Sequence, residues 1–288
     1  MSFSKSFYDV CVSADHMLKE TCQTLIDLGF QTIAVNQHLE EPASESKKKK
    51  KKGEAEEASD LVPPPICLAA LTEVLKGKVK LINRLTFSFS DHLHVHKMTQ
   101  CKNLRKYHLL AAIPTTQTAL QIACSSLDVD IISFDPGRKW HFRLKRKQYN
   151  MAVERGLFFE LMYSPAILDA TARRNLIQTA HMYHSCGKSK NIIISSGGSH
   201  PFHIRGPYDI INLGLIFGLS EEQAKNAITG ACRTLLLHGE GRRFGKAVAF
   251  IAQDGASEND HIVKTATSLG DESDHDGEFQ SAHKKFRH

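Results

Sequence analysis

The sequence predicts an α/β protein whose parallel strands form either a (β/α) barrel or a doubly wound sheet. Short β-rich runs alternate with segments whose apolar residues recur at helical spacing. Several central runs are continuously apolar, as in parallel strands that are covered on both faces. The chain has 288 residues, of which 41% are hydrophobic and 24% charged, so it can bury a large core.

Each expected element follows from a local pattern. β-branched and aromatic residues, bounded by turn residues, predict strands at 7–12, 32–37, 79–90, 109–114, 129–134, 140–145, 157–163 and 191–196. Apolar residues at helical spacing predict helices at 14–29, 115–127, 167–185, 207–218 and 220–228.

Three of these helices carry terminal signals. Gly29 suits the end of the first helix, and Pro207 suits the first position of another. Ser220, with Gln223 three residues later, forms the pattern of a capping box. The predicted boundaries of these helices therefore rest on more than periodicity.

Two segments lack the apolar residues that a folded core requires. Residues 40–64 have almost no large apolar side chains, and residues 254–288 have only scattered ones. Neither segment can bury enough surface to offset the entropy lost on ordering. We therefore expect one barrel domain over residues 1–253, interrupted by a disordered Lys-rich loop at 40–64 and followed by a disordered acidic tail at 254–288.

The charge of the chain is unevenly distributed. The loop holds six Lys against seven acidic residues, and the tail holds four basic against eight acidic residues. Because the whole chain carries +6, the remaining body carries +11. A basic body of this kind attracts polyanions, so nucleic acid is the first partner to consider.

Two other features bear on the environment of the protein. No stretch approaches the roughly 20 consecutive apolar residues of a membrane-spanning helix, and the N-terminus lacks the pattern of a signal peptide. The seven Cys are an odd number without a CxxC pair, which is typical of reduced thiols in a core. We expect a soluble intracellular protein without a membrane partner.

The segment RKWHFRLKRK, residues 138–147, is the most basic part of the predicted body. It holds six Lys or Arg and no acidic residue. In an extended conformation one face would carry Lys139, His141, Arg143, Lys145 and Lys147. Such a row would contact successive phosphates of a nucleic acid, with Arg146 in the following turn. The alternative is an edge strand that its charges protect from aggregation.

Further cations are candidate contacts. Arg174 lies on the exposed side of a predicted helix, with Arg173 at the boundary of its apolar stripe. Arg205 precedes a Gly-Pro helix start, where backbone donors can add to an anion site. Arg233 begins a basic group near the end of the body. Solvated surface positions, or salt bridges to neighbouring loops, are the alternatives for these residues.

The sequence offers only weak signals of catalysis or metal binding. His92, His94 and His96 would point the same way in a strand and could bind zinc or copper, but a helix fits this segment equally well. SSGGS at 195–199 follows a strand without matching a phosphate-binding motif. An acid inside an apolar strand needs a partner when buried, so Glu160 is expected in a buried ion pair, with Arg155 as the candidate, and a catalytic carboxylate is the alternative.

Several long segments resemble one known family. They are LDVDIISF (127–134), MAVERGLFFELMYSPAILDATARRNLI (151–177), NIIISSGGSHPFHIRGPYDIINLGLIFGLSEEQAK (191–225) and CRTLLLHGEGRR (232–243). Together with YDVCV and GFQTIAVNQH near the N-terminus, they are similar to the 30 kDa protein subunit family of eukaryotic and archaeal ribonuclease P, shared in eukaryotes with RNase MRP. The resemblance covers most of the body.

The resemblance implies a TIM-barrel-like (β/α) barrel related to the polymerase and histidinol phosphatase barrels. It also implies a non-catalytic role, because in this family the RNA performs the hydrolysis with bound Mg²⁺ during 5′ maturation of precursor tRNA. The related enzymes carry an HxH metal motif after the first strand, whereas this sequence reads YDVCVSADH. We therefore expect no metal or other cofactor on this chain.

The expected partners are ribonuclease P RNA, MRP RNA, the other protein subunits, and precursor tRNA as substrate of the assembled enzyme. Candidates for contact with RNA or subunits are Lys139, Arg143, Lys145, Arg146, Lys147, Arg173, Arg174, Arg205 and Arg233. Two rival hypotheses are a metal-dependent phosphoesterase that uses the same barrel, and a protein-interaction platform with little RNA contact.

Regulation and location are expected from the two polar segments. The run from Lys47 to Lys52 indicates nuclear import or nonspecific attraction of RNA, and we expect the protein in the nucleus. The resemblance to a family shared with RNase MRP implies the nucleolus and a role in rRNA processing as well. Solvated loop charge is the alternative for this run. Ser257 and Ser273 lie among acidic residues and are candidate phosphorylation sites.

Overall fold

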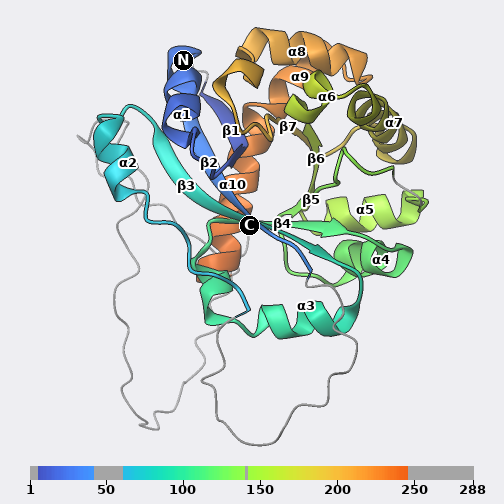
Figure 1. The fold of residues 1–288 in the computed structure, drawn as a ribbon. Coiled ribbons are helices and arrows are strands. Elements are labelled where there is room, and N and C mark those ends of the chain that lie inside the picture. Colours follow the sequence, from blue (N-terminus) through green and yellow to red (C-terminus); the bar gives the residue numbers. More distant parts are fainter. Residues whose placement is uncertain (1–5, 42–60, 140–141, 246–288) are drawn as a thin grey trace, which may run out of the picture. The chain divides into compact units, whose positions relative to one another are not determined.

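The computed structural model of the chain describes residues 6–41, 61–139 and 142–245. Seven parallel strands within them pair in sequence order (Figure 1). They are β1 (Phe7–Ser13), β2 (Phe30–Leu39), β3 (Lys80–Phe89), β4 (Leu109–Pro114), β5 (Ile131–Ile132), β6 (Phe158–Met162) and β7 (Ile192–Ser195). Seven of the predicted strands are confirmed, although β5 is much shorter than expected.

The first and last strands meet and nearly close the sheet. Gly197 N donates to Cys11 O at 2.8 Å, and Ser13 N donates to Gly198 O at 3.0 Å. Val12 and Gly198 form a parallel bridge between these bonds. The SSGGS segment is therefore part of this closure, and the fold is a TIM-barrel-like barrel, not a doubly wound sheet.

Helices surround the strands, except for α10, which lies in the middle of the view (Figure 1). They are α1 (Leu18–Asp27), α2 (Ala69–Val74), α3 (His92–Thr99), α4 (Gln117–Ser125), α5 (Arg146–Glu154), α6 (Ser164–Leu168), α7 (Ala170–Gly187), α8 (Pro207–Ile216), α9 (Glu221–Ala227) and α10 (Gly230–Phe244), with 3-10 turns η1 (Lys102–Lys106) and η2 (Pro201–His203). In the described residues, no helix combines the length and apolar character that crossing a bilayer requires.

The predicted helix signals are confirmed. Pro207 is the first residue of α8, and Gly29 follows α1 with a positive φ of 93°. The Ser220 hydroxyl accepts from Gln223 N at 3.2 Å, while Ser220 N donates to the Gln223 side chain at 3.0 Å. These local contacts satisfy backbone groups that helix ends leave unpaired.

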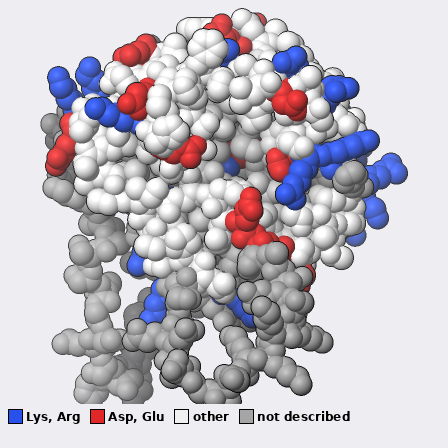
Figure 2. All heavy atoms as spheres, in the orientation of Figure 1, with Lys and Arg blue, Asp and Glu red and all other residues white. Residues whose placement is uncertain are grey.

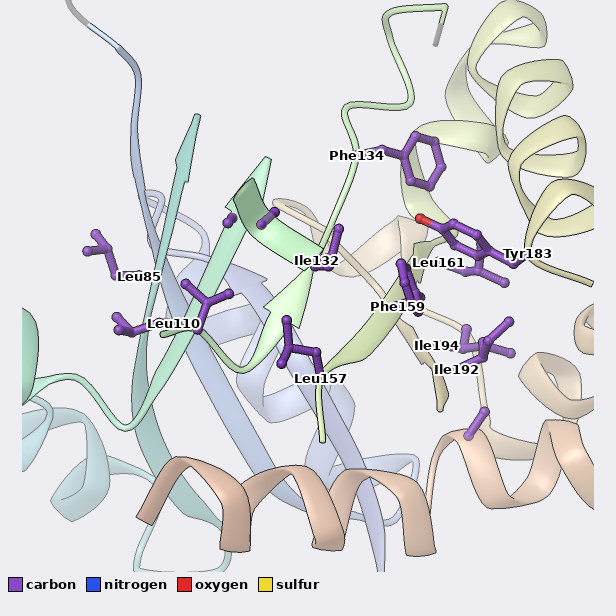
Figure 3. Close-up of a cluster of buried hydrophobic side chains, with 14 of the residues drawn as sticks. Leu85, Leu110, Ile132, Phe134, Leu157, Phe159, Leu161, Tyr183, Ile192 and Ile194 are labelled. Atoms are coloured by element: carbon purple, nitrogen blue, oxygen red, sulfur yellow. The ribbon is translucent and has the colours of Figure 1, made fainter. Parts of the chain in front are cut away.

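One core lies between the strands and the outer helices. Phe159 on β6 stacks on Tyr149 of α5, with ring centroids 4.2 Å apart, and also contacts Tyr183 of α7. Figure 3 shows Phe159 and Leu161 on the side of the sheet that faces Tyr183. Gly187 lets α7 approach closely, because a Cβ there would lie 2.0 Å from the Tyr149 ring.

A second core fills the amino-terminal end of the barrel. Every strand contributes to it, through residues such as Val10, Ala34, Ile82, Leu109, Ile131, Phe158 and Ile193. Ala231, Cys232 and Leu235 of α10 pack against this layer. Helix α10, which contacts β1, β4 and β7, therefore closes this end of the barrel.

The predicted polar loop is partly ordered against the barrel. Val62, inside the range 40–64, is fully buried, and its carbonyl accepts from Asn103 Nδ2 at 3.0 Å. At the other end, Glu41 N donates to Ser88 Oγ at 3.2 Å. Residues 42–60, the tail from 254 with Ser257 and Ser273, and the run from Lys47 to Lys52 lie outside the described residues.

The seven Cys are all free thiols. Five are buried, Cys186 is half-buried, and Cys67 is exposed. Burial raises the pKa of Cys22 and Cys124 to about 12, so these thiols stay protonated at neutral pH. This agrees with the predicted reduced thiols, although Cys67 is exposed and so is not part of the core.

Candidate nucleic-acid interface

The basic segment lies in the loop that connects β5 to α5, at the carboxyl end of the barrel. The backbone of Arg143 is held by Gln117, whose side chain accepts from Arg143 N at 3.0 Å and donates to Arg143 O at 3.3 Å. Leu144 is buried, and its carbonyl accepts from Cys186 Sγ of α7. The loop is therefore fixed between α4 and α7.

The predicted extended row of cations is wrong. Helix α5 begins at Arg146, and Lys145 N donates to Gln148 Oε1 at 2.9 Å in the way of a helix start. Gln148 in turn donates to Gln121 of α4 at 2.6 Å. Positions 142–145 are not a strand, and Trp140 and His141 lie outside the described residues.

Four cations of this segment nevertheless form one exposed group, the basic belt, made of Arg143, Lys145, Arg146 and Lys147. No acidic side chain in the described residues pairs with any of them, whereas the nearby Arg138 pairs with Asp135 at 3.4 Å. Lys139 is exposed in the same loop. Unpaired exposed cations are the groups that contact phosphates.

Arg173 and Arg205 are tied into local structure. Arg173 Nε donates to Ala166 O at 2.9 Å and so satisfies a carbonyl at the end of α6. Arg205 Nη1 donates to the carbonyls of Phe202 and Ile204, both at 2.9 Å. Both guanidinium groups stabilise the loops that follow β6 and β7.

Arg174 and Arg233 are exposed but lie at different ends of the barrel. Arg174 is in the first turns of α7, whereas the basic belt lies beside Cys186 in the last turn, and Arg174 Nε donates within its own helix to Ala170 O at 3.3 Å. Arg233 is on α10, which closes the opposite end. The fold thus gathers the predicted cations at the carboxyl ends of β5, β6 and β7, with Arg233 as the exception.

The surface view agrees with this grouping. Figure 2 shows Lys and Arg side chains gathered on the side of the molecule where α5 and α7 lie in Figure 1. Loops at the carboxyl ends of barrel strands are the usual position of binding sites in this fold. This side is therefore the candidate nucleic-acid interface.

The three neighbouring histidines lie on α3, not on a strand. The rings of His92 and His96 stack at 6.2 Å between centroids, and His96 contacts Gln100. Within the part of the chain that the structure describes, no three His, Cys, Asp or Glu side chains gather in a way that could hold a metal ion.

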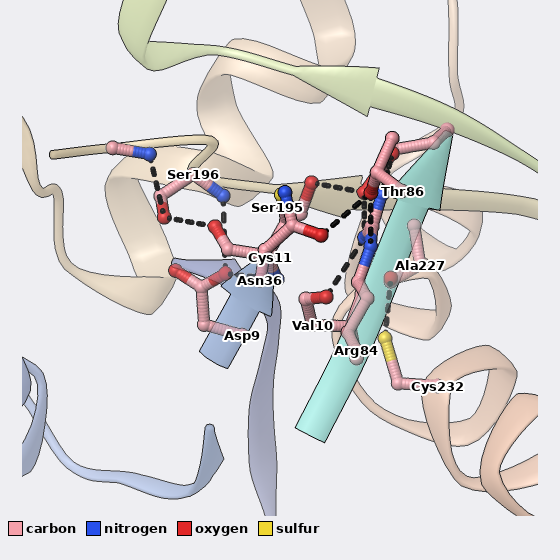
Figure 4. A network of polar contacts seen from close by, with 12 residues as sticks. Asp9, Val10, Cys11, Asn36, Arg84, Thr86, Ser195, Ser196, Ala227 and Cys232 are labelled. Atoms are coloured by element: carbon pink, nitrogen blue, oxygen red, sulfur yellow. Dashed lines mark hydrogen bonds and ion pairs between the residues drawn. The ribbon is translucent and has the colours of Figure 1, made fainter. Parts of the chain in front are cut away.

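The interior of the barrel contains a buried polar network (Figure 4). Arg84 on β3 pairs with Glu160 on β6, and both side chains are fully buried. Burial raises the pKa of the Glu160 carboxyl, but the Arg84 guanidinium outweighs it, so the pKa lies below its usual value. Ser195 Oγ also donates to Glu160, at 2.6 Å.

The predicted partner of Glu160 is therefore wrong. Arg155 donates instead to the carbonyls of Ala123, Cys124 and Leu127, at the end of α4. Arg84 lies 76 residues before Glu160, and only the strand order brings the two together. Buried Arg84 carries no sequence signal of its own, since Arg is usually exposed.

A second carboxylate, Asp9 on β1, lies in the same interior. Its Oδ1 accepts from Cys11 N at 3.1 Å and from Ser196 N at 3.2 Å. Burial raises the pKa of Asp9 to about 6. This contact joins β1 to the loop after β7 and supports the closure of the barrel.

A third carboxylate fixes α10. The side chain of Asp130, just before β5, is fully buried. It accepts from His238 Nδ1 at 2.9 Å and from Arg242 Nε at 3.1 Å. The hydrogen bond to Asp130 raises the pKa of His238, with burial opposing it. The CRTLLLHGEGRR segment is thus a helix that anchors to the barrel, and Glu240 pairs with Arg243 at 3.2 Å within it.

The interior is filled by apolar side chains at one end and by hydrogen-bonded and ion-paired side chains further along, while unpaired cations lie outside. This defines the chain as a TIM-barrel-like α/β protein with an exposed basic surface. The profile of one family, RNase P subunit p30, matches residues 6–244, and the chain belongs to this family.

Individual relatives agree. The chain is 38% identical over 234 residues to mouse ribonuclease P protein subunit p30, covering 78% of this chain and 82% of the mouse protein. It is 24% identical to the ribonuclease P/MRP protein subunit RPP1 of Saccharomyces cerevisiae, covering 91% of this chain and 86% of that one. The resemblance found in the sequence is confirmed.

A solved structure shares the fold. A chain in the cryo-EM structure of archaeal ribonuclease P with mature tRNA superimposes with a TM-score of 0.59 at 15% identity. The match covers 87% of this chain and 99% of the archaeal chain. The barrel architecture is thus that of a chain found within a ribonuclease P particle.

Proposed function

We propose that this ribonuclease P subunit contacts the RNA of the particle through the basic belt, with Lys139 and Arg174 as further contacts. The observation that carries the proposal is the presence of four exposed cations for which no acidic partner lies among the described residues. Gln117 and Leu144 hold the backbone at Arg143, and Arg146 and Lys147 begin α5, so less backbone entropy is lost on contact with phosphates.

The subunit is not the catalyst in this proposal. Its interior is occupied by the Arg84–Glu160 pair and its neighbours, and catalysis resides in the RNA with Mg²⁺ bound there. The chain supports 5′-end maturation of precursor tRNA and, within RNase MRP with its own RNA, the processing of rRNA. It binds no cofactor itself.

The proposed location is the nucleus and nucleolus, with the run from Lys47 to Lys52 as the import signal. Deleting this run and imaging the tagged protein tests this part. Unchanged nuclear accumulation would contradict it. Ser257 and Ser273 remain proposed phosphorylation sites that phosphopeptide mapping can test.

Contact with other protein subunits belongs to a different surface. Tyr208, Leu215 and Ile216 of α8 share one side of the helix, and Tyr208 and Ile216 are 69% and 58% exposed. Exposed apolar stripes of this kind mark protein interfaces. Crosslinking in the purified particle should join α8 to another protein subunit, and crosslinks only to RNA would reject this assignment.

The central experiment is affinity purification of the tagged full-length chain from cells, followed by sequencing of bound RNA and a precursor-tRNA cleavage assay. We expect one or two structured noncoding RNAs and 5′-end cleavage. Recovery without RNA, but with metal-dependent hydrolysis of a generic phosphodiester, would overturn the proposal and favour a phosphoesterase. Metal analysis of the purified chain provides an independent check.

A further inference from the structure

A cavity of about 270 Å³ opens at the amino ends of β6 and β7. Phe158 and Ile192, the first residues of these strands, form its apolar part together with Leu219 and Ala231. Helices α9 and α10 and the loops after α7 and α8 supply the lining outside the strands. Its volume falls slightly below the roughly 300–1,000 Å³ of drug-sized sites, which suits one planar ring system.

The polar lining is neutral. Asn191, Gln223, Asn226 and Thr234 contribute amides and a hydroxyl, and no charged side chain lines the cavity. Among the described residues, no side chain or backbone group bonds to the Asn226 amide, which offers both a donor and an acceptor. Asn191 Nδ2 donates to Leu157 O at 3.1 Å, which leaves its oxygen available. Such amides bind the edges of nucleobases in pairs of hydrogen bonds.

The wall formed by the loop after α7 is held in an unusual conformation. Lys188, Ser189 and Asn191 have φ of 51°, 58° and 51°. Lys188 ends α7 in the ordinary left-handed manner, but Ser189 and Asn191 lie beyond that end. Ser189 Oγ contacts His184 Nδ1 at 3.1 Å, which helps to hold this conformation. Backbone in this region is concentrated at ligand-binding loops.

The end of α7 connects this cavity with the basic belt. Cys186, in the last turn of α7, donates to Leu144 O between Arg143 and Lys145, and the Tyr149 hydroxyl of α5 donates to Lys190 O in the loop that forms the cavity wall. Residues 170–190 contain no Asp or Glu, and exposed residues along this stretch include Arg174, His181, Lys188 and Lys190. A phosphate backbone could cross the end of α7 without meeting an acidic side chain of this helix.

We propose that the cavity binds one unpaired, unstacked base of an RNA strand that passes from the basic belt over the end of α7. This inference rests on the proposed function, because the RNA must first be a partner of the chain. Asn226 and the free oxygen of Asn191 bind the base edge, Phe158 and Ile192 contact its ring, and Lys188 and Lys190 contact the flanking phosphates.

The test uses chemical probing of RNA in particles purified through the full-length chain. Reagents that together modify the Watson–Crick edges of all four bases are applied to the wild type and to Asn226→Ala and Thr234→Trp. Both side chains are exposed at the cavity rim, so these variants remove the free amide or fill the space without opening a core. Asn212→Ala, an exposed amide on α8 away from the cavity, is the control.

We expect one single-stranded nucleotide to be protected in the wild type and in Asn212→Ala. In both cavity variants the chemical reactivity of this nucleotide should rise by roughly fivefold or more. This factor corresponds to the loss of one amide that makes a pair of hydrogen bonds to a base. Identical probing profiles in all four particles would overturn the inference while leaving the proposed function intact. Failure of the wild-type chain to recover RNA would instead overturn the proposed function.

Discussion

Arg84 and Glu160 face each other across the interior of the barrel, with Nη2 and Oε2 2.6 Å apart in a two-bond contact. Arg84 Nη1 also donates to Val10 O at 2.8 Å, so one guanidinium joins β1, β3 and β6. A planar guanidinium suits this two-bond contact, because two of its N–H donors match the spacing of the two carboxylate oxygens.

Removing one member of this pair should strongly destabilise the barrel. Glu160→Ala leaves a buried guanidinium without its counter-charge, and we expect a loss of about 3–5 kcal/mol in the free energy of unfolding. Urea unfolding of the purified chain measures it. The double variant Arg84→Met with Glu160→Leu should recover much of this loss, since it removes both charges. A Glu160→Ala variant as stable as wild type would contradict the assignment.

Two glycines of α10 should respond in opposite ways to alanine. A Cβ at Gly239 would lie 2.5 Å from the backbone oxygen of His108, whereas at Gly241 nothing lies within 4 Å. Gly239→Ala should therefore destabilise by about 1–3 kcal/mol because α10 must move off the barrel. Gly241→Ala should stabilise by about 0.5–1 kcal/mol through helix propensity. Thermal unfolding of both variants measures these changes in stability. Equal effects at the two positions would contradict the packing of α10 against the barrel.

The buried carboxyl of Asp9 predicts a pH dependence. Its folded pKa of about 6 exceeds the ordinary value of 3.8, so the folded state binds the proton more tightly than the unfolded state. Protonation of Asp9 therefore stabilises the folded state fully below pH 3.8, and this stabilisation is lost as the pH rises to about 6. The stability of Asp9→Asn relative to wild type should thus increase between about pH 4 and pH 6, as urea unfolding would show. A constant difference would contradict the raised pKa.

His238 should contribute in a different pH range. Its pKa is raised above 6.5 by Asp130, so its contribution is present below that pH and is lost as the pH rises through the folded pKa. The stability difference between wild type and His238→Gln should therefore shrink as the pH is raised from about 6 to about 9. Denaturant unfolding at several pH values measures it, and a difference that grows with pH would be evidence against the ion pair.

The basic belt should determine part of the salt dependence of RNA binding. Replacing Arg143 and Lys145 by Ala should weaken association and reduce the slope of log K against log salt by about one unit for each lost phosphate contact. Filter binding of particle RNA at several salt concentrations measures the slope. The matched control replaces Lys19 and Lys102, exposed cations of α1 and η1, and should leave it unchanged. An unchanged slope in the belt variant would remove these residues from the interface.

Much of the fold follows from local sequence patterns. The run at 109–114 coincides with β4, and Ser220 with Gln223 begins α9 as expected, because both depend on neighbouring residues alone. The alternation of polar and apolar residues at 140–145 was misleading. Leu144 is buried there by α4 and α7, and not by strand pairing.

The buried polar contacts inside the barrel were much harder to predict from the sequence. Glu160 carried a correct signal of a buried pair, but its partner depends on the order of the strands. The same holds for Asp130, whose two α10 partners lie 108 and 112 residues later. Long-range contacts of this kind arise from topology, and no local pattern encodes them.

The junction between β1 and β7 has a consequence for synthesis on the ribosome. Strand β1 is made first, yet its partners at Gly197 and Gly198 emerge only after most of the barrel, and α10 follows later still. Until then the nascent chain presents an unpaired edge on β1 and an open apolar end. The barrel therefore cannot close at both its seam and its amino-terminal end until about residue 244, the end of α10, has left the exit tunnel.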